Sequence, residues 1–175
     1  MKSDTRGFTL IELLLAMTLL SVLALLLIGN FNSTLKRGRD SQRKNDLGQL
    51  QKALELYYED NKTYPKFDII APNSANKLCT TQACDTSSET FYMIKVPNDP
   101  SSTYTYTYVP EPTPSGGGAS DSYYLYSFLE NTLDTGSSVS QTGYTTGAKC
   151  DSARTSVNCK YYVGSSNSDI LTPNP

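Results

Sequence analysis

The sequence predicts an α+β protein, in which a long N-terminal helix over about residues 8–61 packs on a small antiparallel β-sheet head over residues 62–175. Three observations indicate this fold class. A long apolar run opens the chain, leucines then recur at helical spacing, and alternating Thr and Tyr are followed by a Pro- and Gly-rich turn. A chain of 175 residues is long enough for one modest domain and an anchoring element.

The N-terminus combines a short polar leader with a long apolar run. Residues 1–7 carry Lys2 and Arg6 against Asp4. Residues 8–28 would rise about 31 Å as a helix, which matches a bilayer core. A secretory signal peptide would have a shorter apolar region and a small-x-small cleavage site. An ordinary membrane anchor explains the length of the run but not the acidic residue within it.

Glu12 is the only charged residue of the apolar run. An acidic side chain in hydrocarbon costs about 2.5–3.5 kcal/mol on insertion scales, so it needs a partner. No Lys or Arg lies between Phe8 and Leu35, so the segment supplies no cation. Cleavage after Gly7 would give Phe8 a free α-amino group, four residues before Glu12 and on the same helical face. That group would neutralise the Glu12 of its own chain or of the next subunit.

The stretch Gly-Phe-Thr-Leu-Ile-Glu-Leu-Leu over residues 7–14 resembles the class III signal of type IV prepilins and type II secretion pseudopilins. The resemblance implies the type IV pilin fold. It also implies that a prepilin peptidase cuts after Gly7, that the new N-terminal Phe8 is methylated, and that Glu12 is the assembly carboxylate.

The same resemblance implies where the protein resides and what it contacts. Before assembly it would be a single-pass protein of the cytoplasmic membrane, with its N-terminus in the cytoplasm and its head outside. Afterwards it would be part of an extracellular helical filament. Residues 1–7 would be removed, and residues 8–28 would pass from the inner membrane into the filament core. Its partners would be copies of itself, related pilins, the prepilin peptidase and the assembly machinery of a pilus or secretion system.

The second half of the helix, residues 29–61, is predicted to be amphipathic. Its apolar positions recur at spacings of three and four and form a stripe that would pack against the head, namely Leu47, Leu50, Leu54 and Tyr57. Pro65 excludes the residue before it from helical geometry, so the helix is expected to end near Asn61.

Residues 36–44 carry five cations against one acidic residue. Two interpretations are a solvated helix face and ion pairing with acidic residues of neighbouring subunits. DNA binding, as in uptake pili, would need exposed cations interleaved with aromatic residues, and this run contains none. The net charge of −2 does not indicate an acidic polymer as a partner either. DNA is therefore disfavoured as a partner but left open.

The head is predicted to be rich in short strands. Alternation and β-propensity indicate strands over residues 91–96, 102–109, 123–129 and 160–163. Residues 110–118 are expected to be the turn of a hairpin, and the order of helix, loop, Pro-x-Asp-Pro turn and hairpin again resembles pilin heads. The 13 tyrosines are expected to lie half buried, with their hydroxyls in water.

The four cysteines fall into two local pairs, Cys79 with Cys84 and Cys150 with Cys159. Neither spacing fits a zinc site, and the chain contains no His. An even number of cysteines in a polar, Tyr-rich context favours two disulfides in an oxidising compartment, paired locally. Four cysteines allow three connectivities, and four free buried thiols remain an alternative. Many type IV pilins close a C-terminal loop with a disulfide. A bond between Cys150 and Cys159 would resemble that disulfide.

No catalytic or cofactor site is predicted. The commonest general base is absent because there is no His, and the Ser-x-x-Lys spacing occurs three times without companion motifs. A calcium site, such as major pseudopilins tend to have, would draw on Asn167 and Asp169, which fall short of six to eight oxygen ligands. The predicted function is a structural filament subunit. Alternatives are a type II secretion pseudopilin and a membrane-tethered extracytoplasmic binding module that does not polymerise.

Overall fold

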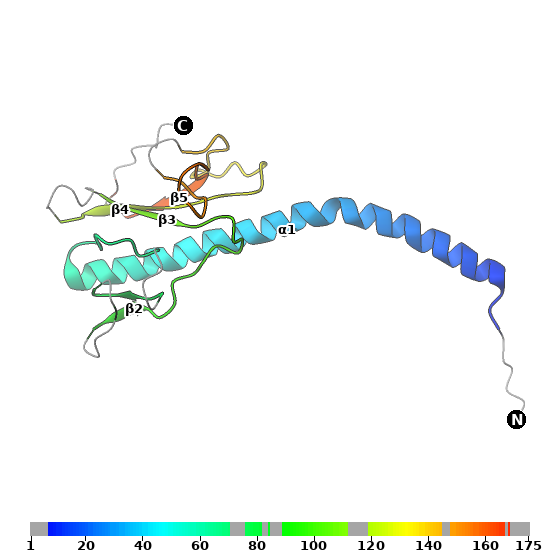
Figure 1. Ribbon diagram of the computed structural model, residues 1–175, viewed down its shortest axis with the longest axis horizontal. Coiled ribbons are helices and arrows are strands. Elements are labelled where there is room, and N and C mark those ends of the chain that lie inside the picture. The colour runs from blue at the N-terminus through cyan, green and yellow to red at the C-terminus, as the bar shows by residue number, and fades with distance from the viewer. Residues whose placement is uncertain are drawn as a thin grey trace, which may run out of the picture. The chain divides into compact units, whose positions relative to one another are not determined.

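The computed structural model of the chain (Figure 1) describes residues 7–70, 76–81, 84, 89–111, 119–144, 148–166 and 168, apart from the side chains of residues 26–30. The chain divides into two compact units, residues 1–38 and 39–175. One helix contributes to both units, and each unit is described by itself below.

The helix α1 (Leu10–Asn61) is continuous along its 52 residues. It begins two residues later than predicted because Thr9 lies outside the helix and caps it with its side chain. It ends where predicted. Lys62 adopts a left-handed φ of 56° and donates its N–H to the carbonyl of Tyr58 at 2.8 Å, which closes the last turn.

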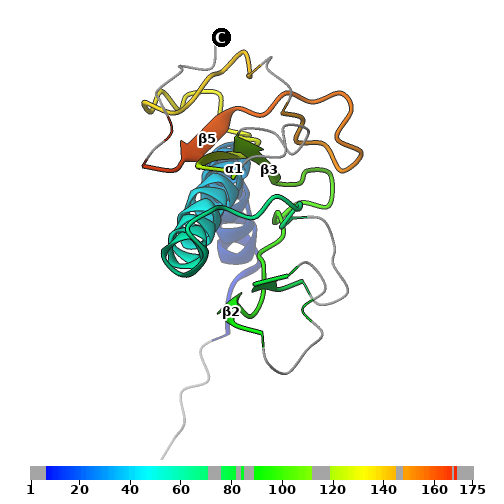
Figure 2. The ribbon, with the colours of Figure 1, turned by 90° about the vertical axis from the view of Figure 1, so that its left-hand side faces the viewer.

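The head contains two antiparallel sheets. Three strands form the larger sheet in the order β3-β4-β5, where β3 is Thr107–Glu111, β4 is Ser122–Ser127 and β5 is Tyr161–Gly164. A separate ribbon pairs β1 (Leu78–Cys79) with β2 (Phe91–Met93). Figures 1 and 2 show the larger sheet along one side of the C-terminal part of α1 and the ribbon on another side. The predicted hairpin is confirmed, whereas β1 was not predicted.

The first strand of the hairpin is displaced from its predicted position. We expected a strand over residues 102–109 and a turn from Pro110, but β3 spans Thr107–Glu111 and includes that proline. Proline is tolerated there because β3 is an edge strand. The residues before β3 have another partner, since the N–H of Thr105 donates to the carbonyl of Cys150 at 2.9 Å.

The main core lies between α1 and the inner face of the larger sheet. The predicted stripe is almost completely buried, with exposed fractions of 0%, 0%, 0% and 6% for Leu47, Leu50, Leu54 and Tyr57. It packs in one cluster with buried side chains of the sheet, among them Tyr108, Tyr123 and Leu125, and with Tyr106, which directly precedes β3. The stripe prediction is therefore confirmed.

A second core covers the outer face of the same sheet. Because strand residues alternate between faces, Tyr126 points away from the side that Tyr123 and Leu125 share. It packs with buried residues of the C-terminal loop, namely Tyr144, Ala148, Cys150 and Cys159. The sheet is therefore buried on both faces, by α1 on one side and by the C-terminal loop on the other.

Several tyrosine hydroxyls are buried, which corrects the expectation that they lie in water. Tyr106 donates to Asp46 at 2.8 Å, and Tyr108 donates to the carbonyl of Pro65 at 2.7 Å. Burial, followed by the neighbouring carboxylate, raises the pKa of Tyr106 far above its usual value. Residue alternation and β-propensity indicated the strands. They could not identify the hydrogen-bond partners of the tyrosine hydroxyls, because these partners lie in distant parts of the chain.

Candidate processing and assembly site

The predicted cleavage point lies in open surroundings. Gly7 precedes α1, and a Cβ atom built on it would meet no other atom within 4 Å. The neighbouring Phe8 is 91% exposed. Among the residues that the structure describes, no contact at this position requires a glycine.

Thr9 and Glu12 form a reciprocal capping box at the start of α1. The Oε2 atom of Glu12 accepts hydrogen bonds from the backbone N–H and the hydroxyl of Thr9, both at 2.9 Å. In return, the N–H of Glu12 donates to the Thr9 hydroxyl at 3.3 Å. This pattern satisfies donors that would otherwise lack partners at a helix N-terminus.

From the sequence we considered only a cation as the partner of Glu12 and missed Thr9. The Thr-x-x-Glu spacing of the capping box was the available signal. These hydrogen bonds do not neutralise the carboxylate, and the uncut chain has no amino group at Phe8. The pairing of that amino group with Glu12 therefore stays a prediction.

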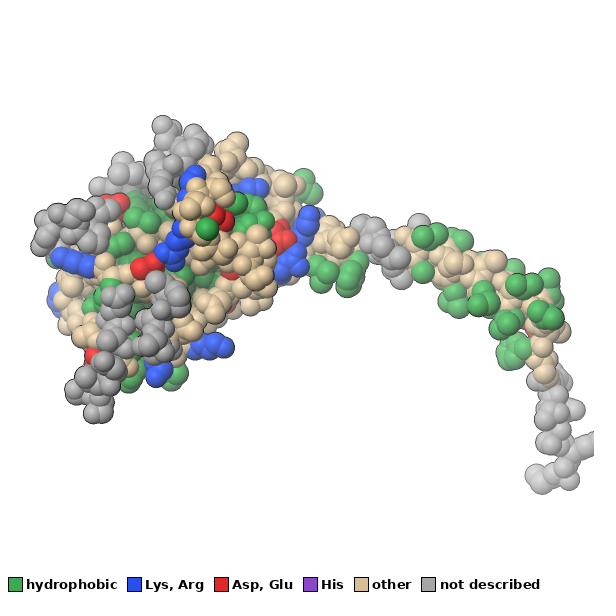
Figure 3. Space-filling view, in the orientation of Figure 1, with side chains coloured by type: hydrophobic (Ala, Val, Ile, Leu, Met, Phe, Trp, Pro, Cys, Tyr) green, Lys and Arg blue, Asp and Glu red, His purple; other side chains and the backbone are tan. Residues whose placement is uncertain are grey.

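The part of α1 that belongs to the first unit has an exposed apolar surface. Figure 3 shows hydrophobic side chains along this segment. Their exposed fractions are 55% or more at many positions, including Leu10, Ile11, Leu14, Met17, Leu20 and Leu25. Measured over the described residues alone, none of the helical segments combines the length and the apolar character that a bilayer crossing requires.

Arg43 is a buried cation at the centre of an ion network in the head. It lies four residues before Leu47 on the stripe face of α1, and its side chain is 0% exposed. Its Nε and Nη2 atoms donate to the two oxygens of Asp99 at 2.7 and 2.8 Å. Its Nη1 atom donates to Asp40 at 2.8 Å and lies 2.9 Å from an oxygen of Glu130.

This network fixes two loops to α1. Asp99 lies in the loop after β2, and Glu130 lies after β4. The carboxylate of Asp40 also accepts the backbone N–H groups of Glu130 and Asn131, at 3.0 and 2.7 Å. Charge-assisted bonds of this kind are stronger than neutral ones.

The network favours the ionised states of Arg43 and Glu130. Burial alone would lower the pKa of Arg43, but the hydrogen bonds with Asp99, Asp40 and Glu130 outweigh it and raise that pKa. Glu130 also accepts a hydrogen bond from Arg39 at 2.8 Å. This bond, followed by the bond from Arg43, lowers the pKa of Glu130 to about 2.

The basic run is therefore not simply a solvated face. Three of its cations pair with carboxylates of the same chain: Arg39 with Glu130, Arg43 with Asp99, and Lys44 with Asp134. Neither predicted interpretation included pairing within the chain. The position of Arg43 on the stripe face was a signal of its burial, whereas its partner Asp99 lies 56 residues further along the chain.

Both cysteine pairs form disulfides within the pair. Cys79 is bonded to Cys84 and Cys150 to Cys159, with Cα–Cα distances of 5.6 and 5.1 Å. Inside the second loop, the Asp151 carboxylate accepts the backbone N–H groups of Thr155, Ser156 and Val157. Burial would raise the pKa of Asp151, but these donors outweigh it and hold that pKa below its usual value.

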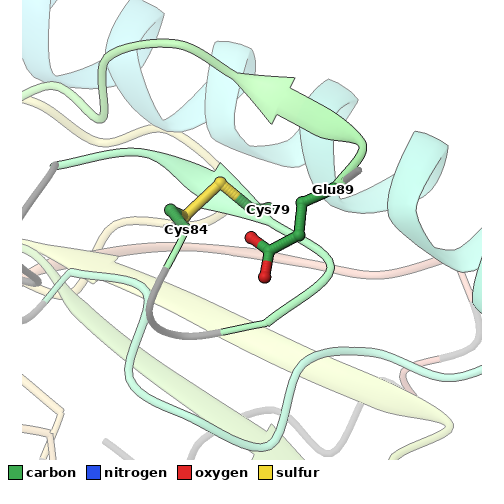
Figure 4. Close-up of side chains that lie close together, drawn as sticks. All are labelled: Cys79, Cys84 and Glu89. Atoms are coloured by element: carbon green, nitrogen blue, oxygen red, sulfur yellow. A yellow bond between two sulfur atoms is a disulfide. The ribbon is translucent and has the colours of Figure 1, made fainter. Parts of the chain in front are cut away.

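Glu89 lies beside the first disulfide (Figure 4), and the ligand atoms of Glu89, Cys79 and Cys84 are all within 4.8 Å of one another. Because the two sulfurs are bonded to each other, they offer no thiolate to a metal. Glu89 instead accepts a hydrogen bond from the Thr81 hydroxyl at 2.6 Å. We assign this trio no metal. The calcium candidates Asn167 and Asp169 lie outside the described residues.

Two family models match the chain. One is described as "Prokaryotic N-terminal methylation motif" and matches residues 2–28. The other is described as "Type IV minor pilin ComP, DNA uptake sequence receptor" and matches residues 29–122, which is more than half of the chain. The chain belongs to this family of type IV pilins. The predicted resemblance and the α+β pilin fold, with its long helix, small antiparallel sheets and two disulfides, are thereby confirmed.

Several characterised proteins are similar to this pilin. Type II secretion system core protein G of Aeromonas hydrophila is 27% identical over 99 residues, which cover 57% of the pilin and 69% of that protein. The same protein of Pectobacterium carotovorum is 28% identical, covering 56% of the pilin and 63% of that protein. The type IV wide pilus major component PilA4 of Thermus thermophilus is 38% identical over 61 residues, which cover 35% of the pilin and 47% of PilA4.

These alignments span about two thirds of the secretion proteins and about half of PilA4. No solved structure shows a significant match to the pilin.

Proposed function

We propose that this pilin is a structural subunit of a type IV pilus-like filament. Its precursor is anchored in the cytoplasmic membrane by residues 8–28, is cleaved after Gly7 and methylated at Phe8, and polymerises through the N-terminal half of α1. The observation that carries the proposal is the prepilin methylation motif at the start of an exposed apolar helix.

The exposed helix surface supports polymerisation. An apolar surface of this extent is unfavourable in water and is normally covered by lipid or by other protein. A membrane would cover it in the precursor, and helices of neighbouring subunits would cover it in the filament. The Glu12 carboxylate, held by Thr9, would then meet the α-amino group that cleavage creates at Phe8.

We further propose that this role is structural and not catalytic. The described ionisable groups with strongly shifted pKa values are explained by packing. Tyr106, Tyr108 and Tyr123 lie in the core, and Glu130 pairs with Arg39 and Arg43. Structural networks of this kind also shift pKa values, so the shifts give no indication of catalysis.

Two specific variants of the function each have an observation in their favour. The similarity to type II secretion core proteins favours a pseudopilus subunit. The family description favours a minor pilin that receives DNA. Binding of the purified protein to duplex DNA at two salt concentrations distinguishes the second, because phosphate contacts weaken steeply with salt.

The first test is the intact mass and N-terminal sequence of the protein recovered from sheared surface filaments. We expect a chain that begins at methylated Phe8 and lacks four cysteine protons. A chain that begins at Met1 and stays monomeric in membranes would contradict the proposal and favour a tethered binding module.

The assembly role of Glu12 has its own test. Glu12→Ala should leave cleavage after Gly7 intact and reduce the amount of filament. Normal filaments from this variant would show that the carboxylate has no role in assembly.

A further inference from the structure

A groove of about 650 Å³ lies beside α1 at the end of β5. Its lining comes from one face of the helix and from the chain at and just after the end of the strand: Gln51, Lys52, Glu55, Leu56, Glu59, Gly164 and Ser166. This volume is within the range of about 300–1,000 Å³ that is typical of binding pockets.

Leu56 contributes an exposed apolar side chain to the lining of the groove. Its exposed fraction is 59%, whereas the leucines of the stripe on the other face of α1 are completely buried. Glu55 and Glu59 line the same groove. Glu55 is held in place by the hydroxyl of Tyr64, which donates to it at 3.0 Å. Glu59 has a side chain that is 77% exposed and contacts only Lys62, at 3.5 Å, among the ion pairs of the described residues.

The N-terminal unit carries a segment with complementary chemistry. Phe31 and Leu35 are 62% and 43% exposed, and their spacing of four places them on one helical face. Lys36 and Arg37 follow directly and are exposed. Neither takes part in the ion pairs found among the described residues.

We propose that the groove of one copy receives residues 31–37 of α1 from a neighbouring copy. Phe31 and Leu35 cover Leu56. Lys36 and Arg37 lie on the two flanks of that apolar face, so one of them lies on the side of Glu55 and Glu59. Lys52 adds one cation to the lining, so a net charge of −1 (one cation, two carboxylates) meets a net charge of +2 from Lys36 and Arg37.

This inference rests on the proposed function and specifies one of its contacts. The groove and the segment that it receives are different surfaces of the same chain. Repetition of such a heterologous contact adds subunits in one direction without closing a pair, as a filament requires. The charges would set which copy, or which related pilin, is accepted, because electrostatic complementarity contributes mainly to specificity.

Cysteine cross-linking in sheared filaments tests the contact. The double variant Leu35→Cys/Leu56→Cys should give a ladder of covalent oligomers larger than dimers under mild oxidation. The matched control is Leu35→Cys/Leu133→Cys, which replaces another exposed leucine of the head, 74% exposed. Each single variant should give no ladder. Before assembly, the thiol introduced at position 56 should react readily with a maleimide.

The outcomes separate the inference from the proposed function. If filaments form but give no more covalent ladder than the control, the inference is wrong and the filament role is unaffected. The same holds if only dimers form. Protection of the thiol at position 56 in the unassembled protein would show an occupant from its own chain and would also overturn the inference. If the unmodified chain forms no filaments, the proposed function is wrong, and so is the proposed contact between copies.

A second set of variants tests the charges without cysteines in the contact. Lys36→Glu/Arg37→Glu should lower filament yield several-fold, and adding Glu59→Lys should restore part of it. Equal yields from both variants would contradict the pairing of these charges.

Discussion

The guanidinium of Arg43 forms two hydrogen bonds with the carboxylate of Asp99, at 2.7 and 2.8 Å, and both side chains are completely buried. The two residues are 56 positions apart in the chain. Their contact joins the helix to the loop after β2, and it is the central interaction of the network that also includes Asp40 and Glu130.

Removal of Asp99 should destabilise the head strongly. Asp99→Ala leaves the buried cation of Arg43 without its bidentate partner, and breaking a buried pair typically costs about 3–5 kcal/mol. Denaturant unfolding measures the loss. The control is Asp121→Ala, at an exposed residue, which should change stability by less than about 0.5 kcal/mol. Similar losses from both variants would show that burial of the pair is not the cause.

Acid should weaken the head through Glu130. Its pKa in the folded protein is about 2, below the ordinary value of 4.5, so its contribution to stability is complete above pH 4.5. That contribution is lost as the pH falls toward 2, because protonation breaks the bonds with Arg39 and Arg43. The measurement is the melting temperature between these two pH values. Glu130→Gln should be less stable at neutral pH and should show a smaller loss on acidification. An unchanged slope would exclude Glu130 as the group responsible.

Substitution of Gly7 should block processing without affecting the fold. A side chain at this position would meet open space, so Gly7→Val should leave the stability of the head unchanged. The peptidase should reject the variant, and mass spectrometry should find the uncut chain in the membrane fraction. Normal cleavage of Gly7→Val would show that recognition lies elsewhere in the leader.

Loss of the second disulfide should destabilise the head. Cys150→Ser/Cys159→Ser opens a short loop, for which about 2–4 kcal/mol is typical. It also places two hydroxyls in the core on the outer face of the sheet, where both cysteines are 0% exposed. Denaturant unfolding of this variant and of Cys79→Ser/Cys84→Ser provides the comparison. We expect the larger loss from the first, and the reverse order would contradict the assigned role of the outer core.

Much of the fold was predictable because it depends on local pattern. The helix end at Asn61 follows from Pro65, and the buried stripe follows from spacings of three and four. The late start of β3 was not predictable in the same way. The residues before it pair with the loop near Cys150 and not with the sheet, and that loop lies far along the chain.

The features of the candidate site also differ in whether the local sequence could predict them. The signature over residues 7–14 is contiguous and could be identified from the sequence, and so could the Thr9–Glu12 capping box that we overlooked. The buried ion network could not be assembled in this way. Arg43 stands on the stripe face, but nothing near it in the sequence indicates that Asp99 and Glu130 lie opposite.

The burial of the β3-β4-β5 sheet on both faces limits how pilins of this kind can be recombined. The C-terminal loop supplies Tyr144, Ala148 and the Cys150–Cys159 bridge to the outer core, where Tyr126 meets them. A loop transplanted from a relative would therefore lack its matching strand residues and leave cavities in the outer core. Exchange of surface properties between such subunits, by recombination or by design, has to move the loop and the outward-facing residues of β4 as one block.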